Sequence, residues 1–124
     1  MNGWTADELD AIGASEELEI STLRADGTAH RFVPIWVVGL DGALYIRSSH
    51  GPESGWFRRA ASAPHVIVRA GGVQREVVLR VAAPSATDID RAYRDKYAVI
   101  GAAWIGDLLS PLASSTTREI VPTA

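Results

Sequence analysis

The sequence predicts a mainly β protein with some helix (α+β): a small antiparallel β-barrel of about six strands, closed or partly closed. Two observations favour this fold class. Short stretches in which apolar and polar residues alternate are separated by turn residues at close spacing, and helical periodicity interrupts them at only a few points. The 124 residues contain no linker, internal repeat or low-complexity tract, so we expect residues 1–124 to form a single domain.

A short helix is expected near the N-terminus. Thr5 and Glu8 have the spacing of a capping box, in which each side chain bonds the other residue's backbone N–H. Trp4 and Leu9 occupy the positions of a hydrophobic staple, and Gly13 is a suitable residue to end the helix.

Alternation then replaces helical periodicity. Residues 17–24 predict a strand, and Asp26-Gly27 predicts the turn of a hairpin. Residues 29–38 predict a second strand, interrupted by Pro34, which cannot donate to a strand ladder and therefore belongs at an edge, a bulge or a ligand site. A third strand is expected at residues 44–48.

The second half of the chain continues the same pattern. The expected elements are a helix at 55–62 closed by Pro64, a hairpin of strands 65–70 and 73–82, an amphipathic helix capped near Thr87, a further short helix at 102–112 and a closing strand at 116–122.

Composition excludes several classes of function. The chain has no cysteine, which excludes disulfides, thiolate catalysis and zinc-finger chemistry. No apolar run is long enough to cross a membrane, and the acidic N-terminus does not resemble a secretory signal. We therefore expect a cytoplasmic protein with no membrane partner.

Charge is distributed unevenly along the chain. Residues 1–26 hold seven acids against one base, whereas residues 27–80 hold seven arginines against three acids. The planar fork of arginine suits bidentate recognition of carboxylate or phosphate. Because the whole chain carries a net charge of −3 and shows no basic stripe with stacking aromatics, we expect a small bound anion rather than nucleic acid.

Residues 45–64, YIRSSHGPESGWFRRAASAP, concentrate the candidate binding groups. Free backbone N–H groups at the start of the predicted helix would form an anion site, which hydroxyl and guanidinium groups would strengthen. Surface arginines more often only solvate a face, so this pattern indicates phosphate or carboxylate and little more. The side chains concerned are Arg47, Ser48, Ser49, Ser54, Arg58 and Arg59.

Catalysis by the chain's own groups has little support. His50 is the only histidine in the candidate site, and His50 and Tyr45 are weak candidates for proton donors. His30 and His65 are expected on strand surfaces, no histidine has metal-ligand spacing, and the nucleophile motif Gly-x-Ser-x-Gly does not occur. An enzyme with this sequence would depend on an organic cofactor.

In order, these features resemble the FMN-binding split-barrel superfamily, which includes pyridoxamine-phosphate-oxidase-like proteins and deazaflavin-dependent nitroreductases. The matching stretches are LRADGTAHRFVPIWVV, LDGALYIRSS and GWFRRAASAPHVIVRAGG. The tail, from IDRAYRDKY to TTREIVP, resembles a bacterial family of unknown function within that superfamily. The likeness covers residues 4–122 and lies in the order of the motifs rather than in any one of them.

The resemblance implies a six-stranded split barrel that forms a homodimer, with FMN or a deazaflavin in a groove between the subunits. The phosphate would lie near Arg47, Ser48, Ser49 and the following helix, and the ring along Pro34, Ile35 and Trp36. FMN-binding members often carry a lysine where this chain has Trp56, and the deazaflavin branch has tryptophan there. This departure favours deazaflavin and also permits a branch with no cofactor.

Three functions therefore stay open. The first is an oxidoreductase that uses a flavin or deazaflavin on a small conjugated or quinone-like substrate. The second is a non-redox barrel that binds a small planar ligand as a sensor, carrier or pathway accessory. The third is an interaction module that uses an apolar patch, although the same patch could be a homodimer interface or a barrel plug. The patch comprises Trp104, Ile105, Leu108 and Leu109.

Overall fold

The computed structural model describes residues 3–81, 85–98 and 102–123. Its helices are α1 (Ala6–Gly13), the 3-10 helix η1 (Gly51–Glu53), α2 (Gly55–Ser62), α3 (Ala86–Tyr97), α4 (Ala102–Leu108) and α5 (Pro111–Ser114). Its strands are β1 (Leu18–Thr22), β2 (Val33–Ile35), β3 (Val37–Leu40), β4 (Ala43–Ile46), β5 (His65–Ala70), β6 (Val73–Val81) and β7 (Arg118–Pro122).

The strands form one antiparallel sheet in the order β2-β1-β5-β6-β7-β4-β3. The two edge strands, β2 and β3, are separated in the chain only by Trp36, so the sheet curls into a nearly closed barrel that stays split between them. The expected mainly β barrel with short flanking helices is confirmed, but the expected strand count is not. Residues 29–38 do not form one strand, because the chain leaves β1 at Trp36 and pairs next with β4.

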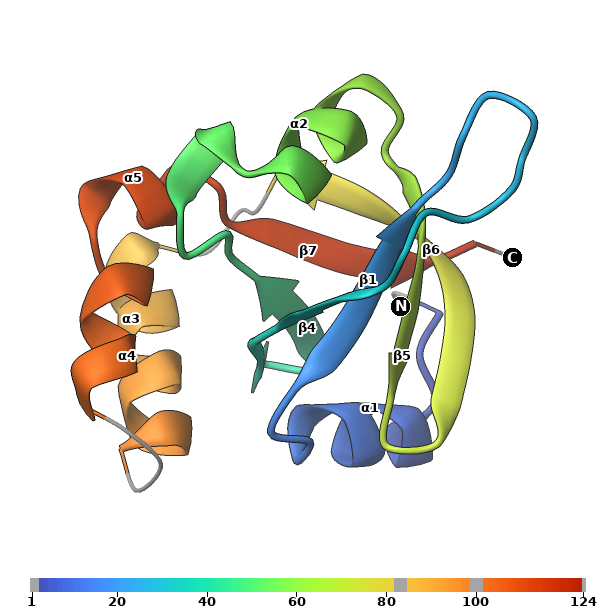
Figure 1. The fold of residues 1–124 in the computed structure, drawn as a ribbon. Coiled ribbons are helices and arrows are strands. Elements are labelled where there is room, and N and C mark those ends of the chain that lie inside the picture. The colour runs from blue at the N-terminus through green and yellow to red at the C-terminus, as the bar shows by residue number, and fades with distance from the viewer. Residues whose placement is uncertain (1–2, 82–84, 99–101, 124) are drawn as a thin grey trace.

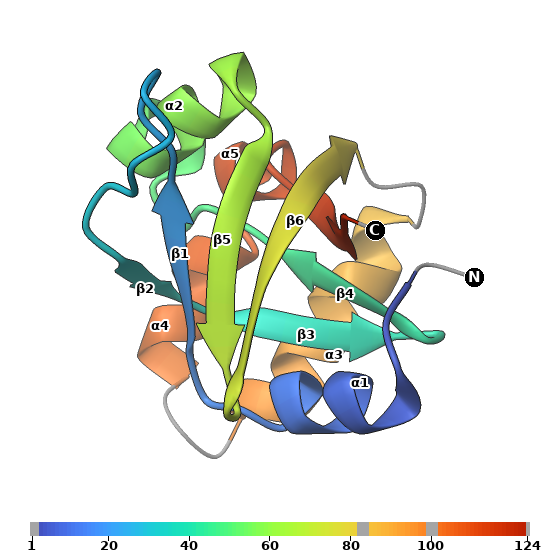
Figure 2. The ribbon, with the colours of Figure 1, turned by 90° about the vertical axis from the view of Figure 1, so that its right-hand side faces the viewer.

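Helices cover the ends and one side of the barrel. α1 lies across one end and α2 across the other, while α3 and α4 lie together against the outside of the sheet (Figures 1 and 2). The expected capping box closes the start of α1: the N–H of Glu8 donates to Thr5 Oγ1, and the N–H of Thr5 donates to Glu8 Oε1.

Two apolar cores result. The first fills the barrel, where residues such as Leu18, Ile20 and Val66 from neighbouring strands meet the inner faces of α1 and α2. The second lies between the outer face of the β3–β4 hairpin and the pair α3 and α4, and it includes Tyr93 and Tyr97. Burial of both cores supplies the main favourable free energy of folding.

No helix in the described part of the chain combines the length and the apolar character that crossing a bilayer requires.

Candidate functional site

A cleft of about 800 Å³ opens beside the split of the barrel. Glu17, which precedes β1, forms one side together with strand β2 and Trp36. α4 contributes to the other side, and η1 with the start of α2 forms one end. Its lining residues are Glu17, Val33, Pro34, Ile35, Trp36, Arg47, Ser48, Ser49, His50, Glu53, Ser54, Gly55, Trp56, Arg59, Asp107 and Leu108. This volume lies in the range typical of ligand pockets.

The cleft brings together most of the candidate site residues. Every expected cofactor-binding residue lines it except Arg58, and the proton-donor candidate His50 lines it too. They come from three separate segments, residues 34–36, 47–50 and 54–59, which the curl of the sheet brings together. Tyr45 is not among the lining residues, because it is buried in the second core.

The start of α2 faces this cleft. Ser54 is the N-cap residue, and within the described structure its side chain makes no capping bond to the helix. Its hydroxyl instead pairs with the hydroxyl of Ser48, with 2.7 Å between the two oxygens. The first backbone N–H groups of α2 therefore keep their capacity to bind an anion, which the helix dipole also favours.

Arg59 places a positive charge beside this helix start. Its Nε donates to Thr22 Oγ1 at 2.7 Å, which fixes the half-buried guanidinium. Its Nη1 lies 3.2 Å from the position that a Cβ atom on Gly55 would take. The absence of a side chain at Gly55 thus lets the guanidinium approach the first turn of α2.

Arg47 is arranged differently from the expectation. Its side chain is completely buried, and its Nη1 bonds Asp90 Oδ1 at 2.6 Å and the carbonyl of Leu108 at 2.9 Å. Its Nε donates to Thr117 Oγ1 at 2.8 Å. These bonds direct the guanidinium among α3, α4 and the residue before β7, so its charge is already paired within the described structure, although Arg47 also lines the cleft.

Trp36 is held firmly at the split. Its indole stacks on the ring of Tyr97, with centroids 4.1 Å apart and planes 9° apart. The hydroxyl of Tyr93 donates to the Trp36 carbonyl at 3.0 Å, and the hydroxyl of Tyr97 accepts the N–H of Val37 at 3.2 Å. Burial raises the pKa of both tyrosines, so they stay protonated and keep these bonds.

Trp56 belongs mainly to the barrel core. It is nearly buried and meets Phe57 edge-on, with ring centroids 5.7 Å apart. Part of its surface lines the cleft. Trp36 and Trp56 therefore give the cleft two aromatic walls that are packed against other rings, an arrangement that suits a flat ligand.

Charge varies along the cleft. Arg59 and the start of α2 make one end positive, whereas the carboxylates of Glu17, Glu53 and Asp107 also line it. His50 is exposed and lines the cleft. Among the described residues, no group of three acidic or histidine side chains lies close enough to hold a metal ion.

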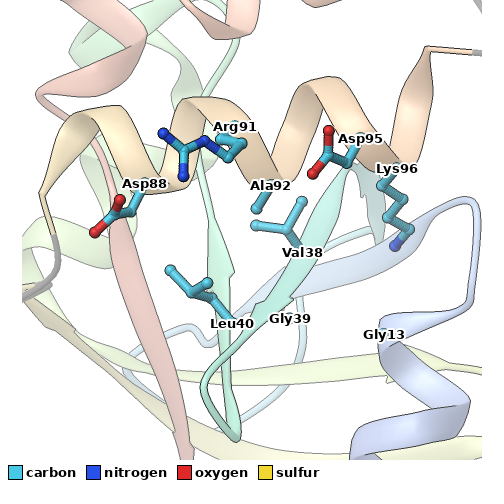
Figure 3. A pocket seen from close by; sticks show the side chains of 9 residues that line it. All are labelled: Gly13, Val38, Gly39, Leu40, Asp88, Arg91, Ala92, Asp95 and Lys96. Carbon is cyan, nitrogen blue, oxygen red and sulfur yellow. The ribbon is translucent and has the colours of Figure 1, made fainter.

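A second hollow, of about 460 Å³, lies between α3 and the β3–β4 hairpin (Figure 3). Lys96 lies at its edge and donates from Nζ to the carbonyl of Val37 at 2.6 Å. Burial lowers the pKa of Lys96 to about 8. No sequence pattern indicated a role for this lysine, and its bond to Val37 supports the β3 edge of the split.

The apolar patch expected on the last helices is not a free surface. Ile105 and Leu108 are buried in the second core, and Leu109 packs against it. The side chain of Trp104 lies outside the described residues. The third expected function, an interaction module, depended on this patch being exposed, and these contacts show that Ile105, Leu108 and Leu109 are packed within the fold.

The chain belongs to a family described as "uncharacterized protein conserved in bacteria", DUF2255, whose model matches residues 8–120. No curated protein sequence matches the chain.

Solved structures share its fold at low sequence identity. An F420 reductase has a TM-score of 0.64 and 13% identity, and the match covers 93% of this chain and 92% of that one. An FAD-binding protein from Mesorhizobium loti has a TM-score of 0.57 and 13% identity over 98% and 91%. The heme storage protein HutZ from Vibrio cholerae has a TM-score of 0.60 and 12% identity over 89% and 83%. The chain therefore has the split-barrel fold of these proteins.

Proposed function

We propose that this protein binds a flavin or deazaflavin in the cleft and acts as an oxidoreductase on a small conjugated or quinone-like substrate. One observation carries the proposal. The start of α2, which lacks a side-chain cap in the described structure, and the guanidinium of Arg59 meet at one end of a cleft whose walls include Trp36 and Trp56. An anionic group and a flat ring are the two parts of a ligand that such a site accommodates.

The residues fit the phosphate end of such a cofactor. The N–H groups at Gly55 and Trp56, the hydroxyl pair Ser48–Ser54 and the guanidinium of Arg59 offer donors within one short region. Ser49 is exposed beside them and adds a further hydroxyl. Arg47 acts indirectly, because it holds the end of β4 against α3 and α4.

The flat part of the cofactor would lie along residues 34–36. β2 bonds to β1 on one side only within the described sheet, so its other edge can meet polar atoms of a ring. Tyr97 covers one face of Trp36 and leaves the rest of the indole to the cleft. Apolar contacts from Val33 and Ile35 would exclude water from that part of the site.

The bound cofactor would supply the hydride transfer, and the chain's own residues would bind, orient and protonate. His50 is the candidate proton donor, because it lines the cleft and reaches solvent. Tyr45 is not retained for this role, since it is buried away from the cleft. Trp56 favours a deazaflavin over FMN, in agreement with the fold that the chain shares with an F420 reductase, and coenzyme F420 is a deazaflavin.

A second candidate is a non-redox protein that holds a planar ligand in the same cleft. The likeness to a heme storage protein supports it, because that protein has the same fold and heme is a planar ligand. Both candidates need the aromatic walls, and only the first needs a ligand that exchanges electrons.

Fluorescence titration of the protein with FMN and with a deazaflavin separates these outcomes. We expect one of the two to bind with a micromolar Kd, and we expect Arg59→Gln to weaken that binding about tenfold. Arg31→Gln is the matched control, since Arg31 is an exposed arginine of the β1–β2 connection that does not line the cleft. Absence of micromolar binding by both cofactors rejects the first candidate, and binding of another planar ligand then favours the second.

We also propose that two copies of the chain share the cleft in a homodimer. Equilibrium sedimentation with and without cofactor tests this arrangement. A monomer in both conditions contradicts it.

A further inference from the structure

A third recess, of about 740 Å³, lies between the β1–β2 connection and the outer side of α2. In Figures 1 and 2 this connection rises next to α2 at the end of the barrel. Four basic side chains line the recess, which we call the basic groove: Arg24, His30, Arg58 and Arg59. None of the described residues that line it is Asp or Glu.

The charges of the basic groove are only partly neutralised. Arg24 donates to the carbonyl of Ala29 at 2.7 Å, and the nearby carboxylate of Asp26 is bonded to Thr28. Asp26 therefore offsets part of the Arg24 charge. Arg58 is exposed, and within the described structure its side chain has no hydrogen-bond or ion-pair partner.

The pKa of His30 reflects this excess of positive charge. Its pKa is lowered by partial loss of solvent and by the positive charges of Arg24 and Arg59. An anion placed among these groups would relieve the repulsion that opposes protonation of His30.

The basic groove is continuous with the cleft. Gly55 and Arg59 line both, so a ligand that begins in the cleft can pass over the first turn of α2 and reach Arg58 and Arg24. Gly55 carries no side chain that would obstruct this path.

We propose that the basic groove is a second anion-binding subsite, which holds a carboxylate or phosphate group beyond the one at the start of α2. The proposal extends the proposed function, because it assigns the ligands of this protein more than one anionic group. That group belongs either to an extension of the cofactor or to an anionic substrate.

NMR titration of the histidines with inorganic phosphate tests the subsite in the protein without cofactor. At constant ionic strength, we expect phosphate to raise the pKa of His30 by about half a unit or more. His65 is the internal control, since it lies on β5 beside Glu76, outside the basic groove. The double variant Arg24→Gln/Arg58→Gln should lose the phosphate-induced rise, whereas Arg31→Gln should keep it. An unchanged His30, or an equal rise at His65 or in the double variant, overturns the proposal.

The same titration in protein saturated with a cofactor identifies the source of the anionic group. If the cofactor itself raises the pKa of His30 and abolishes the phosphate response, the cofactor supplies the group. If the phosphate response persists, a separate ligand such as the substrate supplies it, and the subsite stands in either case. Because the phosphate experiment needs no cofactor, its failure and the failure of the proposed function are distinguishable.

Discussion

Arg47 and Asp90, 43 residues apart in the chain, are joined by a 2.6 Å contact between Nη1 and Oδ1. The arginine side chain is completely buried, and the aspartate side chain is 23% exposed. The pair fixes β4 to the first half of α3, and therefore fixes the cleft wall to the helix that carries Tyr93 and Tyr97.

Removal of this arginine should destabilise the protein. We expect Arg47→Met to lower the free energy of unfolding by about 3–5 kcal/mol, because the substitution leaves buried acceptors without their donor. Arg47→Lys should recover little, since a lysine cannot reproduce the bonds of a planar fork. Urea denaturation measures both variants, and a loss below about 1 kcal/mol for Arg47→Met would show that the pair contributes little.

Gly55→Ala should weaken cofactor binding without lowering the free energy of unfolding. The added Cβ would lie 3.2 Å from Nη1 of Arg59, the flexible end of a side chain, so the guanidinium should move away at little cost to the fold. Alanine also has a better helix propensity than glycine by about 1 kcal/mol. We expect an unchanged or higher free energy of unfolding and a several-fold weaker cofactor affinity. Unchanged affinity in the titration would exclude Arg59 as the anion-binding group.

Tyr97→Phe should lower the free energy of unfolding more than Tyr93→Phe does. The Tyr97 hydroxyl bonds the Val37 N–H and the carbonyl of Glu16, groups on two separate segments. The Tyr93 hydroxyl donates to the Trp36 carbonyl. We expect a loss of about 1–3 kcal/mol for Tyr97→Phe and about 1 kcal/mol for Tyr93→Phe. Equal losses in urea denaturation would show that the additional bonds of the Tyr97 hydroxyl do not stabilise the fold.

Stability should depend on pH through Lys96. Burial lowers its pKa in the folded protein to about 8, from an ordinary value of 10.5. Between these values the unfolded chain binds more protons than the folded one, so stability rises as the pH increases above about 8. Tyr93 and Tyr97 act in the opposite direction above about pH 10, because their raised pKa values make ionisation easier in the unfolded chain.

The difference between wild type and Lys96→Met isolates this effect. We expect the free energy of unfolding of wild type to increase relative to the variant between about pH 8 and 10. A constant difference across that interval would mean that Lys96 titrates normally in the folded protein.

The β5–β6 turn offers a matched pair of glycines. Gly71 has φ +57° and Gly72 has φ +82°, so alanine at either position costs about 1–2 kcal/mol. At Gly71 the added Cβ would also lie 2.5 Å from the carbonyl oxygen of Ala11 in α1, whereas no described atom lies within 4 Å at Gly72. Gly71→Ala should therefore be the more destabilising by about 1–3 kcal/mol in urea denaturation. Equal effects would contradict the close approach of α1.

Local signals predicted the fold elements well. The capping box at Thr5 and Glu8 and the helix from Gly55 to Ser62 depend on residues close together in the chain, and both form as expected. The division of residues 29–38 at Trp36 was missed, because the strand pairings that separate β2 from β3 are made with β1 and β4.

The candidate site was predicted in position more than in detail. The sequence indicated which segments supply the cleft, but it could not show that Arg47 is bonded to Asp90 and Thr117 across the fold. The sequence offers Asp90 a nearer partner, Arg94, at the i, i+4 spacing of a helix, so no local signal indicated the pair with Arg47. The basic groove depends on contact between two segments, which composition alone does not reveal.

We expect the start of α2 and Arg59 to bind the anionic end of a flat cofactor. A crystal structure of the protein with FMN or a deazaflavin would decide this. We expect the phosphate within hydrogen-bond distance of the N–H groups at the start of α2 and of Arg59, with the ring beside Trp36. A cofactor bound with its phosphate elsewhere would exclude this site.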